Sequence, residues 1–311
     1  MSVQVRLLGP VEITEVGGPV PLGGPKERAV LAVLALNAGQ VVSEDSLMQA
    51  LWGDSPPRTA TRTLQAYISR LRKVLATGDG VVRIESIGGG FRLDAPGDAL
   101  DCVRVGRLAA DARAAASRED YERAAELYAD ALAHWTGRPL GEFADEEWAR
   151  PEAARLAELR LTLLEERVEA DLRCGRHAVL TGELEITCKD NPFRERLWAQ
   201  RILALYRSGR QADALATYRE LRHRLADELG VDPSPDVQAL ERSILKQDET
   251  LEPPTPARTV PAASGQPPFP SGLVPVGISD FVGRSAELRS LHEYWQRTAA
   301  FDIAQASALP T

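Results

Sequence analysis

One short stretch of the chain carries the residue types that bind polyanions. Residues 55–73, SPPRTATRTLQAYISRLRK, contain five arginines or lysines and no acid, although the whole chain of 311 residues has a formal net charge of −8. A purely basic segment in an acidic protein is typical of a surface kept for nucleic acid. These residues therefore predict binding to double-stranded DNA.

The spacing of apolar residues places this basic stretch on a helix. Four apolar side chains recur at intervals of four, three and four: Leu64, Ile68, Leu71 and Leu75. This periodicity predicts a helix over about Thr59 to Leu75 with one buried stripe. The opposite face then carries Arg62, Ala66, Ser69 and Lys73, flanked by Gln65, Arg70 and Arg72. Arginine can pair with guanine and glutamine with adenine through two hydrogen bonds each, and Ser, Thr or Lys can hold phosphates, so this face can read a DNA groove.

The elements around this helix are short. Strand signals over 3–13 and 20–22 predict a small antiparallel sheet, and a periodic run predicts a first helix over Lys26–Asn37. Ser43 can cap a second helix that ends at Trp52-Gly53. Two further strands, 81–87 and 91–93, flank the triplet Gly88-Gly89-Gly90 and predict a hairpin. A glycine-rich hairpin after a groove-reading helix is interpreted as a wing.

The order of sheet, three helices and hairpin resembles the winged helix of OmpR-type response regulators, in which the third helix enters the major groove. The motifs that carry the resemblance are Trp52-Gly53, Arg62-Thr63, the run ISRLRK over 68–73, and Gly90-Phe91-Arg92-Leu93. The sequence departs from several relatives at Ser69, where they have arginine.

The resemblance implies roles for individual residues. Arg70 would reach bases, and the residues that would lie near phosphates are Trp52, Arg62, Thr63, Tyr67, Ser69 and Arg72. Together with the outward face of the helix, this predicts a base-reading set of Arg70, Ser69 and Gln65. It predicts a phosphate-contacting set of Trp52, Arg58, Arg62, Thr63, Tyr67, Arg72 and Lys73. The wing is expected to contribute Arg83, Gly88, Gly89 and Gly90.

The middle of the chain has a different composition. Residues 1–97 carry 10 basic and 9 acidic side chains, whereas residues 98–250 carry 23 and 31, so the acidity belongs to the second segment. That segment shows helical patterns and almost no strand signal. Gly175-Arg176 recurs 34 residues later as Gly209-Arg210, which is the tetratricopeptide period. We therefore expect residues 1–97 to form the DNA-binding domain, and 98–250 an all-α tetratricopeptide-like domain that contacts proteins.

A winged helix followed by helical repeats and the run DALATYRELRHRLADELGVDPSPDVQALERSIL (213–245) closely resembles the Streptomyces antibiotic regulatory protein (SARP) family. The resemblance covers about residues 1–250. It implies a bacterial transcriptional activator domain, activation of secondary-metabolite gene clusters, and direct-repeat operators that overlap the −35 element. It further implies contact with RNA polymerase holoenzyme through its principal sigma factor, and a homodimer or side-by-side protomers on DNA.

Residues 251–311 are expected to be a disordered, proline-rich linker followed by the start of a further domain. Residues Phe281–Leu288 resemble the signature that opens the nucleotide-binding domain of the large, AfsR-like members of that family. No G-x-x-x-x-G-K-[ST] motif follows, so we expect no nucleotide binding and no ATPase activity.

Other kinds of site are not indicated. Cys102, Cys174 and Cys188 lie far apart, and the four histidines stand at no metal-ligand spacing. We expect no catalytic residues, metal or cofactor, and a cytoplasmic protein without a membrane contact. Two alternatives to activation stay open from the residues: a repressor, and a module whose repeat domain recognises an effector or partner. An ATP-dependent signalling enzyme is the third reading, and the missing phosphate loop argues against it.

Overall fold

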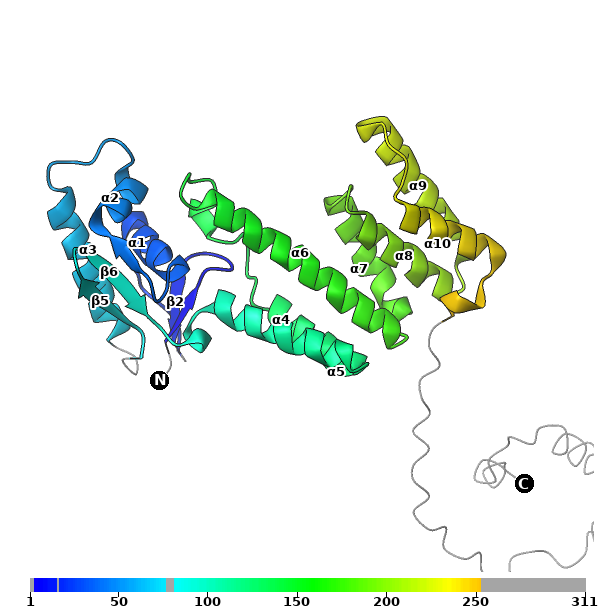
Figure 1. Ribbon diagram of the computed structural model, residues 1–311, viewed down its shortest axis with the longest axis horizontal. Coiled ribbons are helices and arrows are strands. Elements are labelled where there is room, and N and C mark those ends of the chain that lie inside the picture. The colour runs from blue at the N-terminus through cyan, green and yellow to red at the C-terminus, as the bar shows by residue number, and fades with distance from the viewer. Residues whose placement is uncertain (1–2, 16, 77–80, 253–311) are drawn as a thin grey trace, which may run out of the picture. The chain divides into compact units, whose positions relative to one another are not determined.

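The computed structural model describes residues 3–15, 17–76 and 81–252. The chain is mainly helical with two small sheets (Figure 1), which confirms the expected fold class of a winged helix followed by an all-α segment. The expectations for the proline-rich tail and for Phe281–Leu288 lie outside the described residues. Within those residues, no helix is both long enough and apolar enough to cross a membrane.

The first sheet is antiparallel in the order β1 (Gln4–Arg6), β2 (Glu12–Glu15) and β3 (Gly18–Val20). Val5 and Ile13 pair across it, and both are fully buried. The strand expected over 20–22 lies instead at Gly18–Val20, because Glu15 pairs directly with Gly18 and the turn is therefore shorter.

The winged helix follows. Its helices are α1 (Pro25–Leu36), α2 (Glu44–Trp52) and α3 (Ala60–Leu75). Ser43 caps α2 as predicted, since its Oγ accepts a 3.0 Å hydrogen bond from the N–H of Ser46. The second sheet has the order β4 (Val41–Ser43), β6 (Gly90–Asp94), β5 (Arg83–Ile87). Strand β4 was not expected from the sequence, because its three residues are too few to show an alternating pattern.

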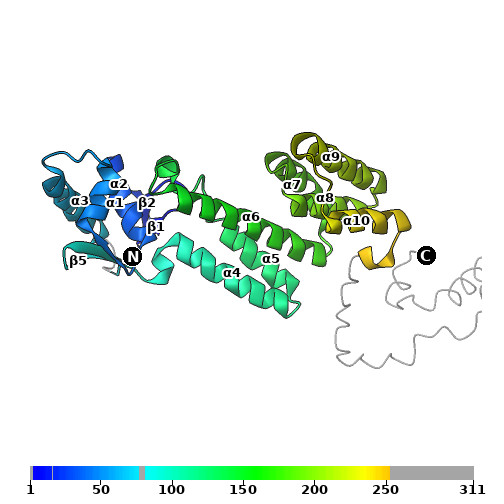
Figure 2. The same ribbon diagram turned by 45° about the horizontal axis from the view of Figure 1, so that its top comes forward.

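Helices make up the rest of the described chain, apart from short 3-10 turns and loops. They are α4 (Asp101–Ser117), α5 (Tyr121–Leu132), α6 (Arg150–Arg173), α7 (His177–Asp190), α8 (Glu195–Arg207), α9 (Gln211–Leu229) and α10 (Pro235–Lys246). Figures 1 and 2 both show α4, α5 and α6 side by side. The repeated Gly175 and Gly209 have the same φ of 74°, so the same left-handed turn closes α6 and α8.

Three apolar cores hold the described residues together. The first lies in the winged helix, the second among α7 to α10, and the third among α4, α5 and α6. Helix α6 contributes to each of them: Ala153 to the first, Leu156 and Leu163 to the third, and Val168 and Leu172 to the second. The first core therefore continues beyond residue 97, where we expect the DNA-binding domain to end.

A buried carboxylate joins the winged helix to α4. Asp101, which is 6% exposed, accepts hydrogen bonds from the backbone N–H groups of Leu7 (2.8 Å) and Leu8 (2.9 Å) and from that of Cys102 (2.7 Å). Burial raises the pKa of this carboxyl, and the three N–H groups act in the opposite direction. The carboxylate thus satisfies N–H groups at the end of β1 and at the first turn of α4.

We expect Asp101→Ala to lower the free energy of unfolding by about 3 kcal/mol, because it leaves buried N–H groups without an acceptor. Urea unfolding followed by circular dichroism measures the change. Asp111→Ala, on the exposed side of the same helix, is the matched control and should change stability by less than about 0.5 kcal/mol. Equal stability of the two variants would show that the Asp101 carboxylate does not hold this junction.

Candidate nucleic-acid interface

Helix α3 has one buried face and one exposed basic face. Its apolar stripe is buried as the periodicity predicts, with exposures of 0% to 1% at Leu64, Ile68, Leu71 and Leu75. These side chains pack into the first core with residues of α1, α2 and β5. The polar residues between them are thereby held on the outer surface, and α3 itself contains no acidic residue.

Three cations on or before α3 are unpaired. Arg58, Arg62 and Lys73 are all exposed, and their side chains have no hydrogen bond or ion pair within the described parts of the chain. Ser69 is exposed on the same helix, and Thr63 is half-buried near its start. An unpaired guanidinium or ammonium group can neutralise a phosphate without first breaking a bond in the protein.

Arg70 is oriented by an acid from another helix. Its Nε lies 2.9 Å from Oε2 of Glu27 on α1, and the Glu27 side chain is 4% exposed whereas that of Arg70 is 53% exposed. The guanidinium also lies over the Tyr67 ring, 5.2 Å from its centroid. Because Glu27 takes only the Nε position, both terminal NH₂ groups of Arg70 stay available for a bidentate contact.

Gln65 is also held by an acid that α3 does not contain. Its side-chain NH₂ donates a 2.7 Å hydrogen bond to Glu44, a first-turn residue of α2. A bidentate contact with adenine needs both the NH₂ and the carbonyl oxygen of glutamine. Base reading by Gln65 therefore requires that this NH₂ be shared with, or released from, Glu44.

Arg72 connects α3 to the hairpin. Its Nε donates to the carbonyl oxygen of Ile84 (2.8 Å), and one terminal nitrogen donates to Oγ of Ser86 (2.9 Å). Both acceptors lie on β5, so Arg72 fixes the hairpin against the helix. In this arrangement Arg72 is committed to the protein itself, although the sequence pattern groups it with the phosphate contacts.

The expected wing is the turn between β5 and β6. Gly88 and Gly89 have φ of 54° and 83°, a conformation that favours glycine, and they form the turn. Gly90 is not part of the turn, contrary to the sequence-based assignment: it is the first residue of β6, and a Cβ there would collide with the carbonyl oxygen of Val42. Arg83 pairs with Glu85 and Asp94 on the strands, so its charge is balanced locally.

Trp52 lies at the end of α2, where it is half-buried under Lys26. The Nζ of Lys26 is 4.8 Å from the centre of the indole ring. The pair places one further positive charge beside a residue expected to lie near phosphates. The structure thus brings Arg58, Arg62, Gln65, Ser69, Arg70 and Lys73 together on and just before α3, and sets Trp52 and Arg83 on neighbouring elements.

Sequence reasoning missed the two acids that orient this surface, Glu27 and Glu44. Glu27 offered a signal, because it falls within the apolar stripe of α1 and is only 3% exposed. A carboxylate at a buried position needs a partner, and arginine is the usual one. Glu44 offered no such signal, since an acid in the first turn of a helix is favourable for local reasons alone.

Features of a catalytic centre do not gather elsewhere in the described residues. No group of three or more His, Cys, Asp or Glu side chains within them could hold a metal ion. Burial raises the pKa of Cys102 to about 11 and that of Cys188 to about 12, so neither thiol is activated as a nucleophile at neutral pH.

Two family models match the chain. The model described as "Transcriptional regulatory protein, C terminal" matches residues 18–93, and the one described as "Bacterial transcriptional activator domain" matches residues 100–245. These matches cover the winged helix and the helices α4 to α10 in turn. The fold and the two models define a transcriptional regulator with a DNA-binding domain followed by an activator domain.

Similar proteins agree with this class. The chain is 38% identical to regulatory protein DnrI of Streptomyces peucetius, over 84% of this chain and 98% of DnrI. It is 42% identical to regulatory protein AfsR of Streptomyces coelicolor over 94% of its own length, but this match spans only 29% of AfsR. A solved structure of Mycobacterium tuberculosis EmbR in complex with a low-affinity phosphopeptide matches with a TM-score of 0.75 and 37% identity, over 81% of this chain and 66% of that one. The chain belongs to the Streptomyces antibiotic regulatory protein family.

We expect Arg72→Ala to loosen the hairpin, because both of its bonds to β5 are lost. Amide hydrogen exchange in the protein without DNA should become faster across β5 and β6, with a loss of stability of about 1 kcal/mol. The neighbouring Lys73→Ala variant is the control, since Lys73 has no partner in the described chain and its loss should leave exchange unchanged. Unchanged exchange in Arg72→Ala would contradict a structural role for this arginine.

Proposed function

We propose that this protein is a sequence-specific transcription activator that places α3 in the major groove of double-stranded DNA. The observation that carries the proposal is the exposed face of α3, where unpaired cations adjoin an arginine held in place by a buried glutamate. A helix with this surface, followed by a hairpin, matches the docking geometry of winged helix-turn-helix proteins. The match of residues 18–93 to a transcriptional regulatory domain supports the same use.

The contacts divide into two kinds in this proposal. Arg70 reads a guanine with its two terminal NH₂ groups, since Glu27 occupies only its Nε. Ser69 and Gln65 complete the base-reading set. Arg58, Arg62 and Lys73 neutralise phosphates, and the uncharged Trp52, Thr63 and Tyr67 contact phosphates through hydrogen bonds. The guanidinium of Arg72 already donates two hydrogen bonds to β5. Arg72 therefore contacts the DNA backbone only through its remaining N–H groups.

The promoter context is proposed from the family. We infer that the protein binds direct repeats near the −35 element of secondary-metabolite gene clusters, with protomers side by side. We further infer that the activator domain recruits RNA polymerase holoenzyme through its principal sigma factor. The similarity to DnrI along nearly its whole length supports this assignment, and the acidic composition of residues 98–250 suits contact with protein rather than with phosphates.

We expect the purified protein to protect direct repeats in promoters of its own gene neighbourhood from DNase I. Protection should be stronger when RNA polymerase holoenzyme is present, because recruitment couples the two binding events. Protection that excludes polymerase would instead identify a repressor. A lack of protection at every promoter would contradict the DNA-binding proposal and favour the repeat helices as an effector-binding module.

Two variants separate base reading from phosphate contact. Arg70→Ala should lower the discrimination between operator and random DNA by about 1 to 3 kcal/mol, because a bidentate base contact is lost. Arg62→Ala should weaken binding to both DNAs alike and reduce the slope of log K against log salt by about 0.9. Fluorescence anisotropy at several salt concentrations measures both effects. Equal losses on operator and random DNA for Arg70→Ala would sink its assignment as a base reader.

A further inference from the structure

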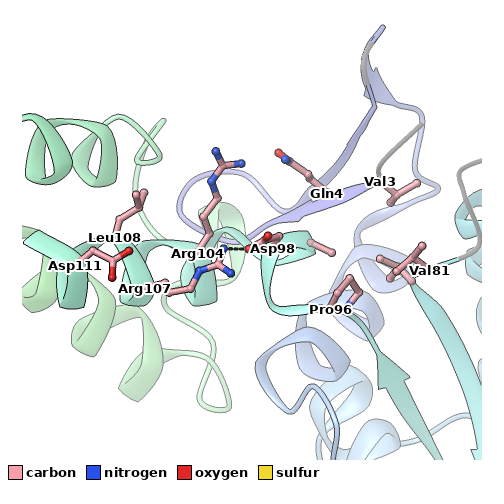
Figure 3. A pocket seen from close by; sticks show the side chains of 11 residues that line it. Val3, Gln4, Val81, Pro96, Asp98, Arg104, Arg107, Leu108 and Asp111 are labelled. Carbon is pink, nitrogen blue, oxygen red and sulfur yellow. Dashed lines mark ion pairs between the residues drawn. The ribbon is translucent and has the colours of Figure 1, made fainter.

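A cavity of about 650 Å³ lies between the first sheet and α4. One wall is formed by Val3 just before β1, by Gln4 of β1 and by Val81 just before β5, and the other by residues of α4 between Arg104 and Asp111 (Figure 3). Any molecule that fills it therefore touches both the winged helix and the activator domain.

The inner surface of the cavity is partly apolar. Val81 is 47% exposed, Pro96 is exposed, and Leu108 adds a half-buried side chain from α4. Small-molecule sites combine such an apolar surface with a few polar groups, in volumes of about 300 to 1,000 Å³. This cavity falls within that range.

The two arginines that line the cavity differ in whether they have an acidic partner. Arg107 forms an ion pair with Asp98, so these two charges compensate each other. Arg104 has no hydrogen bond or ion pair of its side chain within the described residues, and Figure 3 shows it on the same side as Gln4.

We propose that this cavity binds a small organic monoanion, a carboxylate on a short apolar chain. The carboxylate lies against the guanidinium of Arg104 and the amide of Gln4, and the chain covers Pro96 and Leu108. Asp111, at the far end of the lining residues on α4, disfavours a second negative charge on the ligand. The apolar surface likewise disfavours a phosphate of nucleic acid, which has no group to place there.

This ligand site is independent of the proposed DNA contacts. Its polar residues lie on β1, on α4 and in the turn between β6 and α4, and none of them belongs to α3. Because the ligand touches two domains only when they are correctly joined, binding raises the temperature of unfolding of the protein without DNA. Failure of this site to bind would leave the proposal for α3 unaffected.

Hexanoate and its neutral counterpart hexanamide test the site by isothermal titration calorimetry on the whole chain. We expect one hexanoate per protomer, with hexanamide binding at least about tenfold more weakly, because it lacks the charge-assisted contact. Arg104→Gln should weaken hexanoate by a similar factor and leave hexanamide unchanged. Arg118→Gln, an exposed arginine at the end of α4, is the matched control and should bind both probes as the wild type does.

Asp111→Asn supplies a second variant that acts in the opposite direction. It removes a repelling charge from the lining, so hexanoate should bind about two- to threefold more tightly while hexanamide does not change. Thermal unfolding in hexanoate confirms that each variant is folded. Equal affinities for the two probes, no saturable heat with the wild type, or an Arg104→Gln variant with wild-type affinity for hexanoate would each overturn the proposal.

Discussion

The buried carboxylate of Asp101 is the contact on which the arrangement of the two domains depends. Strand β1 lies at the edge of its sheet, and the two residues that follow it, Leu7 and Leu8, are buried and have N–H groups that donate to Asp101. Burying such groups without an acceptor is costly. Asp101 accepts both while also lying at the N-terminus of α4, where a negative charge is favourable. The side chain of Asp101 therefore binds the N–H groups of the two residues that follow β1, and Asp101 is also the first residue of α4 in the next domain.

Helix α6 also connects the two domains, because it packs into all three apolar cores of the described residues. Its 24 residues span about 36 Å. A helix packed along its whole length in this way cannot rotate in one core without disturbing another. The repeat helices α7 to α10 are thus linked to the winged helix by packing, and not only by the continuity of the chain.

How far the sequence predicts the structure depends on the range of the interactions involved. The stripe from Leu64 to Leu75 and the cap at Ser43 are local patterns, and both are found as predicted. Strand β4 was missed, because it pairs with residues of β6 about 50 positions away. The place of Gly90 in β6 was missed, because a run of three glycines predicts a turn, whereas Gly90 pairs with Ile87 and Ser43. The orientation of Arg70 was missed for the same reason as β4, since Glu27 lies 43 residues away. Whether the predicted residues contact DNA is a property of a complex, and neither periodicity nor packing determines it.

In the winged helix, α3 carries basic residues, and the acidic residues that contact its side chains lie on other helices. Helix α3 has no acid of its own, yet Glu27 and Glu44 from other helices hold Arg70 and Gln65. An acid within α3 would repel the phosphates near it, whereas the buried Glu27 restricts the rotation of Arg70 at little electrostatic cost to the outer surface. Arg58, Arg62 and Lys73 have no such partner among the residues that the structure describes, and they suit phosphates, which occur at every position of the duplex. Arg70, the main base-reading candidate, is thus held in place before DNA is bound, whereas three of the phosphate-contacting candidates keep their charges available, a division that suits sequence-specific binding.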